Sequence, residues 1–210
     1  MDFQDPTIVV FVARHGTTVL NAAGRFRGKL NPDLDEKGIR DAHKLAKLFS
    51  NIDLSYIICS DKTRAVHTAD IIAQPKQIQV HHTEELRALN VGDFSGVKRT
   101  AETEAQLEVF LSQPDCPIPG GESLNDFKSR IQPCIKEAVD LYQDTGVPPL
   151  IVAHSSIIHE VGSMIYGEHK SVLVEPGGVL AIYYRDGKLG ASPIFKPANK
   201  PAGNRSDTVS

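Results

Sequence analysis

The chain has no tryptophan, two methionines and three cysteines among its 210 residues. The cysteines, Cys59, Cys116 and Cys134, form no Cys-x-x-Cys pair, so the sequence offers neither a zinc site nor a disulfide framework. No apolar stretch reaches the roughly 18 residues of a membrane span, and the first residues lack the basic and apolar regions of a signal peptide. The basic residues are scattered and the net charge is −3, which argues against a nucleic-acid partner. We therefore expect a cytoplasmic protein that uses no metal and no cofactor and binds neither nucleic acid nor membrane.

Length and composition predict one layered domain. A chain of this length with 40% hydrophobic residues can bury one substantial core. We expect this core within a single domain over residues 1–195. Residues 196–210 are rich in proline, asparagine, serine and glycine, and they are predicted to be disordered. The sequence leaves the oligomeric state open, with a homodimer as one option.

Short apolar runs alternate with segments of helical period along the chain. The predicted strands cover residues 8–12, 56–59, 78–81, 150–153, 179–184 and 189–195, the last two joined by an Asp186-Gly187 turn. The predicted helices begin at Asp35, at Ser60 or Asp61, near Thr100, at Ser123 and at Ser155 or Ser156. The first has an apolar stripe of Ile39, Ala42, Leu45, Ala46 and Phe49, and the fourth is expected to kink or break near Pro133. This alternation predicts a three-layer α/β/α sandwich around a mostly parallel sheet.

Polar residues follow three of the predicted strands directly. Arg14-His15-Gly16 follows the first, Ser60 with Arg64 the second, and His154-Ser155 the fourth. Because the carboxyl ends of parallel strands share one edge of a sheet, we expect these residues to converge in one crevice, where Gly16 lets a ligand approach the backbone. Two guanidinium groups can clamp phosphoryl oxygens, and an imidazole can attack phosphorus to form a covalent intermediate. The residues therefore indicate phosphoryl transfer.

Five sequence elements occur in an order that is typical of one protein family. They are Arg14-His15-Gly16, then Asn21 with Arg25-Phe26-Arg27-Gly28, then Ser60 with Arg64, Ala65, Thr68 and Ala69, then Pro119 to Ser123, and finally Ala153-His154. On these elements the chain resembles the histidine phosphatase, or phosphoglycerate mutase-like, superfamily from about Ile8 to Tyr184. The resemblance implies a phosphoglycerate mutase-like fold and a small phosphorylated substrate.

The resemblance also implies roles for the candidate site residues. His15 would be the phosphorylated nucleophile, and His154 would stabilise the transferring group. Arg14 and Arg64 would bind the phosphoryl oxygens. The candidate substrate-binding residues are Gly16, Thr17, Asn21, Arg25, Glu122 and Ser155.

The proton donor is the main departure from this family. Its usual acid is a glutamate in a Leu-x-Glu-x-x-x-Gly element, but Ala88 occupies that position here. Asp93, in the same glycine-flanked loop, is the first candidate for a substitute catalytic acid. Glu84, Glu85 and Glu122 are further candidates, although the place of Glu122 before a predicted helix favours a role at the helix dipole.

Three functions fit this pattern. The preferred one is a metal-independent phosphomonoesterase that hydrolyses a small phosphorylated metabolite through phospho-His15. A phosphoglycerate-type mutase is the second, but such mutases usually carry a longer insertion than the roughly two dozen residues between Gly96 and Gly120. The third, suggested by Ala88, is a catalytically weak module that binds phosphate or has a regulatory role.

Overall fold

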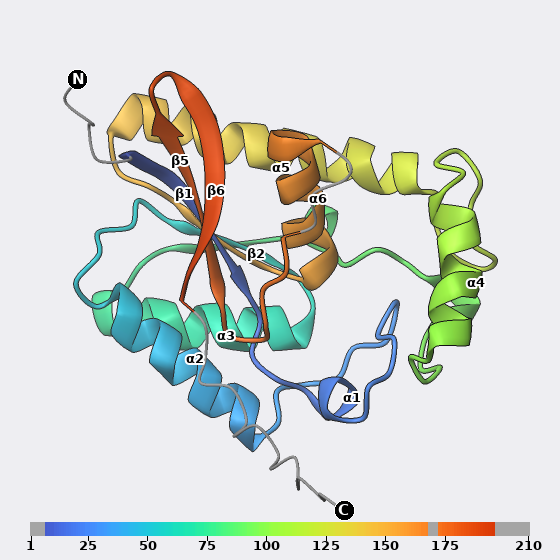
Figure 1. Cartoon of the computed structure of the whole chain (residues 1–210). Coiled ribbons are helices and arrows are strands. Elements are labelled where there is room, and N and C mark those ends of the chain that lie inside the picture. Colours follow the sequence, from blue (N-terminus) through green and yellow to red (C-terminus); the bar gives the residue numbers. More distant parts are fainter. Residues whose placement is uncertain (1–6, 168–171, 196–210) are drawn as a thin grey trace, which may run out of the picture.

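The computed structural model describes residues 7–167 and 172–195 (Figure 1). The strands are β1 (Thr7–Arg14), β2 (Ile57–Ser60), β3 (Val80–Thr83), β4 (Leu150–Ala153), β5 (Val179–Arg185) and β6 (Lys188–Phe195). The α-helices are α1 (Val19–Ala22), α2 (Glu36–Phe49), α3 (Thr63–Ala73), α4 (Ala101–Leu111), α5 (Leu124–Thr145) and α6 (Ser155–Tyr166). Short 3-10 helices cover η1 (Gln74–Lys76), η2 (Glu84–Leu86) and η3 (Gly92–Phe94). The expected disorder of residues 196–210 concerns a segment outside the described residues.

The strands form one sheet in the order β3-β2-β4-β1-β5-β6. Strands β1 to β4 run parallel, whereas β5 pairs antiparallel with β1, and β6 antiparallel with β5. Phe11 lies opposite Leu150, and Arg14 opposite Ala153, in the central β1–β4 pair. The predicted α/β fold with a mostly parallel sheet is confirmed.

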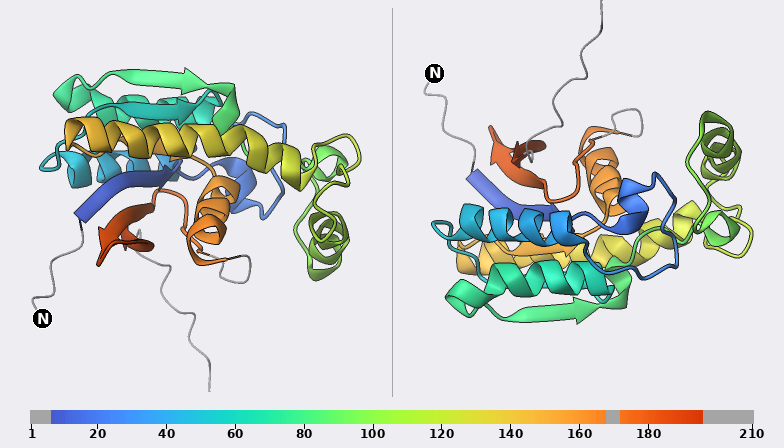
Figure 2. Two further views of the ribbon diagram at one scale, coloured as in Figure 1. Left: turned by 90° about the horizontal axis from the view of Figure 1, so that it is seen from above. Right: turned by 90° about the horizontal axis from the view of Figure 1, so that it is seen from below.

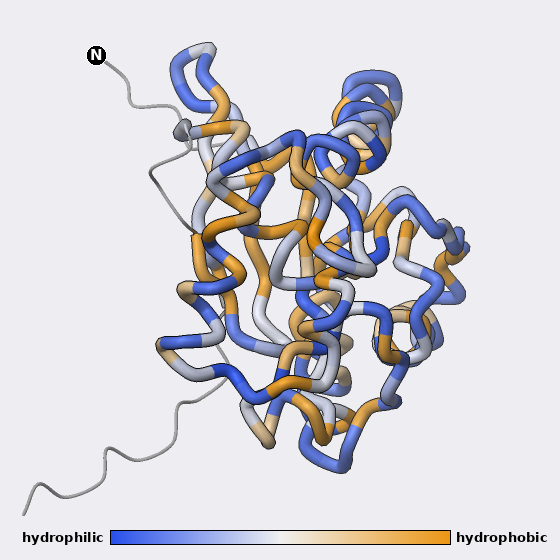
Figure 3. Tube along the Cα trace, turned by 90° about the vertical axis from the view of Figure 1, so that its right-hand side faces the viewer, coloured by the Kyte–Doolittle hydropathy of each residue, from blue (hydrophilic) through white to orange (hydrophobic). Residues whose placement is uncertain are grey.

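Helices cover both faces of the sheet because the side chains of the strands alternate between them. Phe11 and Ala13 of β1 pack in one apolar cluster with residues of α2 and α3. Val10 and Val12 pack in a second cluster with residues of α5 and α6. Figure 1 shows α2 and α3 on one side of the sheet and α5 and α6 on the other, while α4 lies apart at one end of the molecule, as Figure 2 also shows. Hydrophilic stretches gather on the outer turns of the trace in Figure 3. None of the helices within the described ranges combines the length and the apolar composition that a membrane span needs.

Helix α2 differs from expectation near its N-terminus. Asp35 caps it, as expected, by accepting a hydrogen bond from the Gly38 backbone N–H at 2.8 Å. Ala42, Leu45 and Phe49 of the predicted apolar stripe are buried. Ile39 of the same stripe is exposed, and Gly38 and Asp41 are buried as well. The reason is that Gly38 lies against the backbone that follows β1, which sets the rotation of the helix.

The predicted start of α3 was wrong, and of the two alternatives predicted at Pro133, a kink or a break, the break was wrong. Helix α3 begins at Thr63 after Lys62, not after Ser60 or Asp61, because Ser60 still belongs to β2. Helix α5 runs through Pro133 without a break. Ile131 and Ile135, on either side of Pro133, are both buried in the core, so packing holds the helix together across the missing backbone donor.

The chain reverses its direction of winding between β1 and β4. From β1 it crosses through α2 to β2, toward the β3 edge, whereas from β4 it crosses through α6 to β5, toward the β6 edge. Ligands of open α/β sheets bind outside the carboxyl ends of strands at such a reversal. The fold therefore places a crevice where β1 and β4 end.

Candidate active site

Three strand ends meet at this crevice. His15 directly follows β1, Ser60 ends β2, and His154 directly follows β4, and all three side chains are buried. The ring centroids of His15 and His154 lie 5.2 Å apart, and His154 Nε2 lies 2.9 Å from Ser60 Oγ. The structure thus brings together the strand ends that the sequence placed in one crevice.

The hydrogen bonds of His15 fix which of its nitrogens is free to react. Its Nδ1 lies 2.6 Å from the Gly16 carbonyl oxygen, which can only accept, so Nδ1 carries the proton. Arg64 Nε donates to His15 Nε2 at 3.3 Å. Nε2 of the neutral ring therefore carries a lone pair, as a nucleophile requires.

Arg64 links the two histidines. It reaches the site from the first turn of α3 and is completely buried. Its Nη2 lies 3.3 Å from His154 Nδ1, and its Nη1 donates to the Leu30 carbonyl oxygen at 3.2 Å. Because a guanidinium only donates, Nδ1 of His154 accepts, and the Nε2 proton of neutral His154 points to Ser60. These contacts hold both rings in one orientation.

Arg14 and Arg27 add two more guanidinium groups. Arg14 Nη1 donates to the Val174 carbonyl oxygen at 2.7 Å, and Arg27 Nη2 donates to Ser155 Oγ at 3.3 Å. The Nε atoms of both arginines are buried and have no hydrogen-bond partner among the described residues. Since buried donors are normally paired, these two indicate where a ligand with acceptor oxygens binds.

Charge in this cluster is poorly compensated. Burial, and then the neighbouring arginines, lower the pKa of Arg14 and Arg64 to about 9 each; burial and Arg99 lower the pKa of Arg27 to about 10. Burial and the same cations hold the pKa values of His15 and His154 well below 6.5. At neutral pH the arginines are therefore charged and the histidines neutral, and this arrangement attracts an anion.

Gly16 and Thr17 lie beside the cluster, and both contact helix α2. A Cβ atom on Gly16 would lie 2.3 Å from the Gly38 carbonyl oxygen, so the approach of α2 requires this glycine. This contact alone requires glycine at position 16, and the approach of a ligand to the Gly16 backbone stays a prediction. Thr17 Oγ1 donates to the buried Asp41 carboxylate at 2.8 Å and so faces α2. Asp41 was not singled out from the sequence. The available signal is its place three residues after Gly38, which puts both residues on the same side of the helix.

The side chains of Asn21 and Arg25 form hydrogen bonds outside the cluster of histidines and arginines. The Asn21 side-chain oxygen accepts from the Thr18 backbone N–H and hydroxyl at 3.2 and 2.9 Å, within the capping box of α1. Arg25 is exposed and donates to the Gly96 carbonyl oxygen at 2.7 Å. The arginine that reaches the site from this loop is Arg27, which sequence reasoning missed, because the two arginines flank Phe26 symmetrically in the sequence.

Ser155 and Glu122 lie in different surroundings. Ser155 is the first residue of α6 and accepts the hydrogen bond from Arg27. Glu122 Oε1 accepts from the Asn90 backbone N–H and from Arg130, both at 2.7 Å. Arg130 Nε also donates to Oε2 at 2.9 Å, so both carboxylate oxygens are bonded and Glu122 anchors the loop before η3.

The other candidate carboxylates differ in whether they form ion pairs. Glu84 pairs with Arg87 at 2.8 Å, and Glu85 is exposed. Asp93 is exposed on η3 and forms no ion pair within the described residues. A further carboxylate, Glu175, is exposed in the loop before β5, and its charge acts on Arg14.

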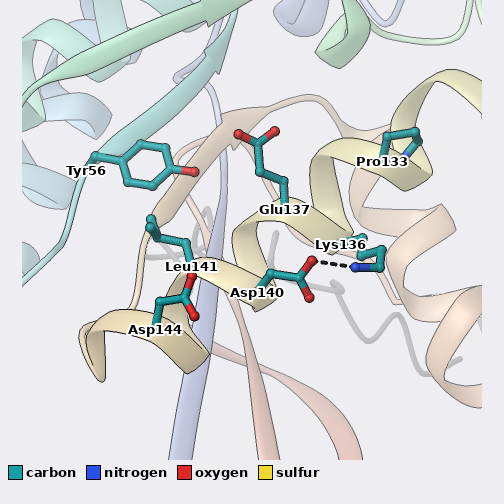
Figure 4. Close-up of a pocket in the computed structure, with 7 residues that line it drawn as sticks. All are labelled: Tyr56, Pro133, Lys136, Glu137, Asp140, Leu141 and Asp144. Atoms are coloured by element: carbon teal, nitrogen blue, oxygen red, sulfur yellow. Dashed lines mark hydrogen bonds and ion pairs between the residues drawn. The ribbon is translucent and has the colours of Figure 1, made fainter.

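No metal cluster accompanies this site in the part of the chain that the structure describes: no three histidine, cysteine or carboxylate side chains gather there as an ion would need. A separate pocket lies along α5 (Figure 4). Its lining includes Glu137, Asp140 and Asp144, and Lys136 there is paired with Asp140. This acidic pocket does not suit a phosphorylated ligand.

Comparison with known proteins agrees with the geometry. Residues 10–183 match the model of the histidine phosphatase superfamily (branch 1). The chain is 32% identical over 164 residues to a Cronobacter sakazakii protein named "Probable phosphoglycerate mutase GpmB", covering 75% of this chain and 74% of that one.

Solved structures give the same result. A phosphoglycerate mutase from Bacillus anthracis superimposes with a TM-score of 0.75 and 26% identity, covering 90% of this chain and 94% of that one. An alpha-ribazole phosphatase from Shigella flexneri superimposes with a TM-score of 0.68 and 25% identity, covering 88% and 94%. The matched span includes both histidines and all three guanidinium groups of the site. The chain belongs to the histidine phosphatase superfamily.

Proposed function

We propose that this protein is a phosphatase that hydrolyses a phosphate monoester of a small metabolite through a phosphohistidine at His15. The observation that carries the proposal is the neutral, buried His15 ring, whose Nε2 lone pair lies beside Arg64 within a group of three arginines. A nucleophile and a cationic clamp for the transferred group are the two parts that phosphoryl transfer needs.

The first half-reaction transfers the phosphoryl group to the enzyme. His15 Nε2 attacks phosphorus, and the N–P bond forms as the bond from phosphorus to the ester oxygen breaks. Arg14 and Arg64 donate to the phosphoryl oxygens, on which negative charge is spread. The leaving oxygen takes a proton from a carboxylic acid. The candidates are Asp93, which the sequence suggests, and Glu175, whose charge acts on Arg14.

The second half-reaction releases phosphate. Water attacks phosphorus, the N–P bond breaks, and its electron pair returns to Nε2. The proton from water goes to the carboxylate that was left after the first step, so the enzyme regains its starting state. His154, whose orientation Ser60 and Arg64 fix, stabilises the transferring group in both steps.

A mutase is the second candidate, favoured by the names of two similar proteins, the Cronobacter and Bacillus phosphoglycerate mutases. In a mutase the phosphoryl group returns from histidine to a second hydroxyl of the bound sugar acid and is not lost to water. The two activities therefore differ in the product that accumulates, which is free phosphate for one and an isomerised phosphate ester for the other.

The experiment is a panel of phosphorylated metabolites with a chelator present, followed by ³¹P NMR. We expect the wild type to release inorganic phosphate from some members and His15→Ala to release none. Isomerisation without release of phosphate would favour the mutase. Full activity in His15→Ala would refute both.

A further inference from the structure

The site contains more positive charge than a transferred phosphoryl group neutralises. Arg14, Arg27 and Arg64 supply three positive charges around two neutral histidines. Arg99 adds a further positive charge that acts on Arg14 and Arg27, and Glu175 offsets one charge at Arg14. A phosphate monoester supplies about two negative charges at neutral pH. Lys62 adds a further cation that acts on His154. Desolvated charge is costly unless it is paired, so the bound state calls for one more negative group.

Resting on the proposed function, we propose that the substrate carries a second anionic group on its leaving portion and that Arg27 binds this group. The partner is a carboxylate or a second phosphate close to the bond that breaks. Either one accepts two parallel hydrogen bonds from a guanidinium fork, which a lysine ammonium cannot reproduce.

The contacts of the arginines separate their tasks. Arg64 is tied to both histidines and thus to the transferred phosphorus. Arg27 instead contacts Ser155 Oγ, beyond His154 along the chain, and keeps a buried Nε without a partner among the described residues. It therefore has donors to spare for a group other than the one that Arg64 holds.

Arg27 lies in the first of two segments, residues 24–28 and 91–98, whose backbones are hydrogen-bonded to each other. Phe26 N–H donates to the Val97 carbonyl oxygen at 2.9 Å, and Gly96 N–H donates to the Phe26 carbonyl oxygen at 2.8 Å. Arg25 and Lys98 form an isolated antiparallel bridge between the same two segments. Asp93, the first candidate for the catalytic acid, lies in this second segment. Arg27 thus lies between the histidines and the segment that carries Asp93.

The test uses substrates that differ in the second anion alone. We compare 2-phosphoglycolate with ethyl phosphate, and propane-1,3-diyl bisphosphate with propyl phosphate, by kcat/KM in the wild type, Arg27→Ala and Arg27→Lys. Arg40→Ala serves as control, since it removes an exposed guanidinium from α2. We expect the wild type to prefer the doubly anionic member of at least one pair, and Arg27→Ala to remove that preference by a loss of about 10- to 100-fold for that member, the range of a charge-assisted hydrogen bond. Arg27→Lys should restore little of it, and the pair that responds tells a carboxylate from a phosphate.

Other results overturn the inference. An equal loss on all four substrates would mean that Arg27 binds the transferred phosphoryl group. No loss in Arg27→Ala would remove Arg27 from recognition. Calorimetric binding of the same compounds to His15→Ala and to His15→Ala with Arg27→Ala needs no turnover. Tighter binding of a doubly anionic compound that vanishes without Arg27 would uphold the inference even if His15-dependent hydrolysis, and with it the proposed function, failed. Equal binding to both variants would refute the inference.

Discussion

Acidification should destabilise this protein through two buried histidines. The pKa values of His15 and His154 are held well below 6.5, first by burial and then by neighbouring cations. In the unfolded chain both rings titrate near 6.5. Below that pH the unfolded state binds more protons than the folded state, so the free energy of unfolding falls as the pH falls, until the folded-state pKa is reached. Above about pH 7.5 the two histidines have almost no effect.

The magnitude follows from proton binding to the unfolded chain. Each ring that stays neutral in the folded state costs about 1.4 kcal/mol of stability at pH 5.5, relative to pH 7.5. For His15 and His154 together the loss is about 2.8 kcal/mol, which corresponds to a melting temperature lower by roughly 6 to 11 °C for a chain of this size.

Urea unfolding at pH 7.5, 6.5 and 5.5 measures this loss. The wild type should lose stability by the stated amount, whereas a variant with His15→Gln and His154→Gln should lose about 2.8 kcal/mol less between the same limits. His81→Gln, which changes an exposed ring on β3, should follow the wild type. Parallel pH dependences of the wild type and the double variant would refute the reasoning, because they would mean that the two rings take up protons in the folded state.

Three further predictions concern single residues. Arg64→Ala should lower kcat/KM by about 10²- to 10³-fold, the cost of losing one preorganised oxyanion donor, and a loss below tenfold would place Arg64 outside the transition state. Asp93→Asn should slow hydrolysis of an alkyl phosphate by about 10²-fold while barely changing nitrophenyl phosphate, whose leaving group needs no proton; if Glu175→Gln shows this pattern instead, Glu175 is the acid. Glu122→Gln should cost about 2 kcal/mol in urea unfolding because it weakens a half-buried ion pair, whereas Glu104→Gln, in an exposed pair, should cost under about 0.5 kcal/mol; equal costs would contradict the anchoring role.

The sequence predicts the scaffold of the site well because strand ends have a local signature. Runs such as Ile8–Val12 and Leu150–Ala153 are short, apolar and rich in β-branched residues, and the polar residue that follows each one marks where the strand leaves the core. Parallel packing then brings His15 and His154 together without further information.

Contacts made by loops and helix rotation could not be predicted in this way. Arg25 and Arg27 flank the same buried Phe26, and tertiary packing against residues 91–98 alone decides that Arg27 faces the site. Position 16 requires glycine because Gly38 of α2 packs against it. The local sequence pattern does not show that these two segments are close in space. The sequence predicts the reacting groups, and packing decides which of the residues around them are available to a ligand.

The most direct test of the account is to trap the phosphorylated enzyme. The protein is mixed briefly with a ³²P-labelled substrate that it hydrolyses, denatured in alkali, and digested for mass spectrometry of the peptide that contains His15. We predict a label that is stable in alkali, labile in acid and located on His15, and absent from His15→Ala. A label on any other side chain, or rapid turnover with no labelled protein in the wild type, would contradict the central claim that His15 Nε2 carries the phosphoryl group.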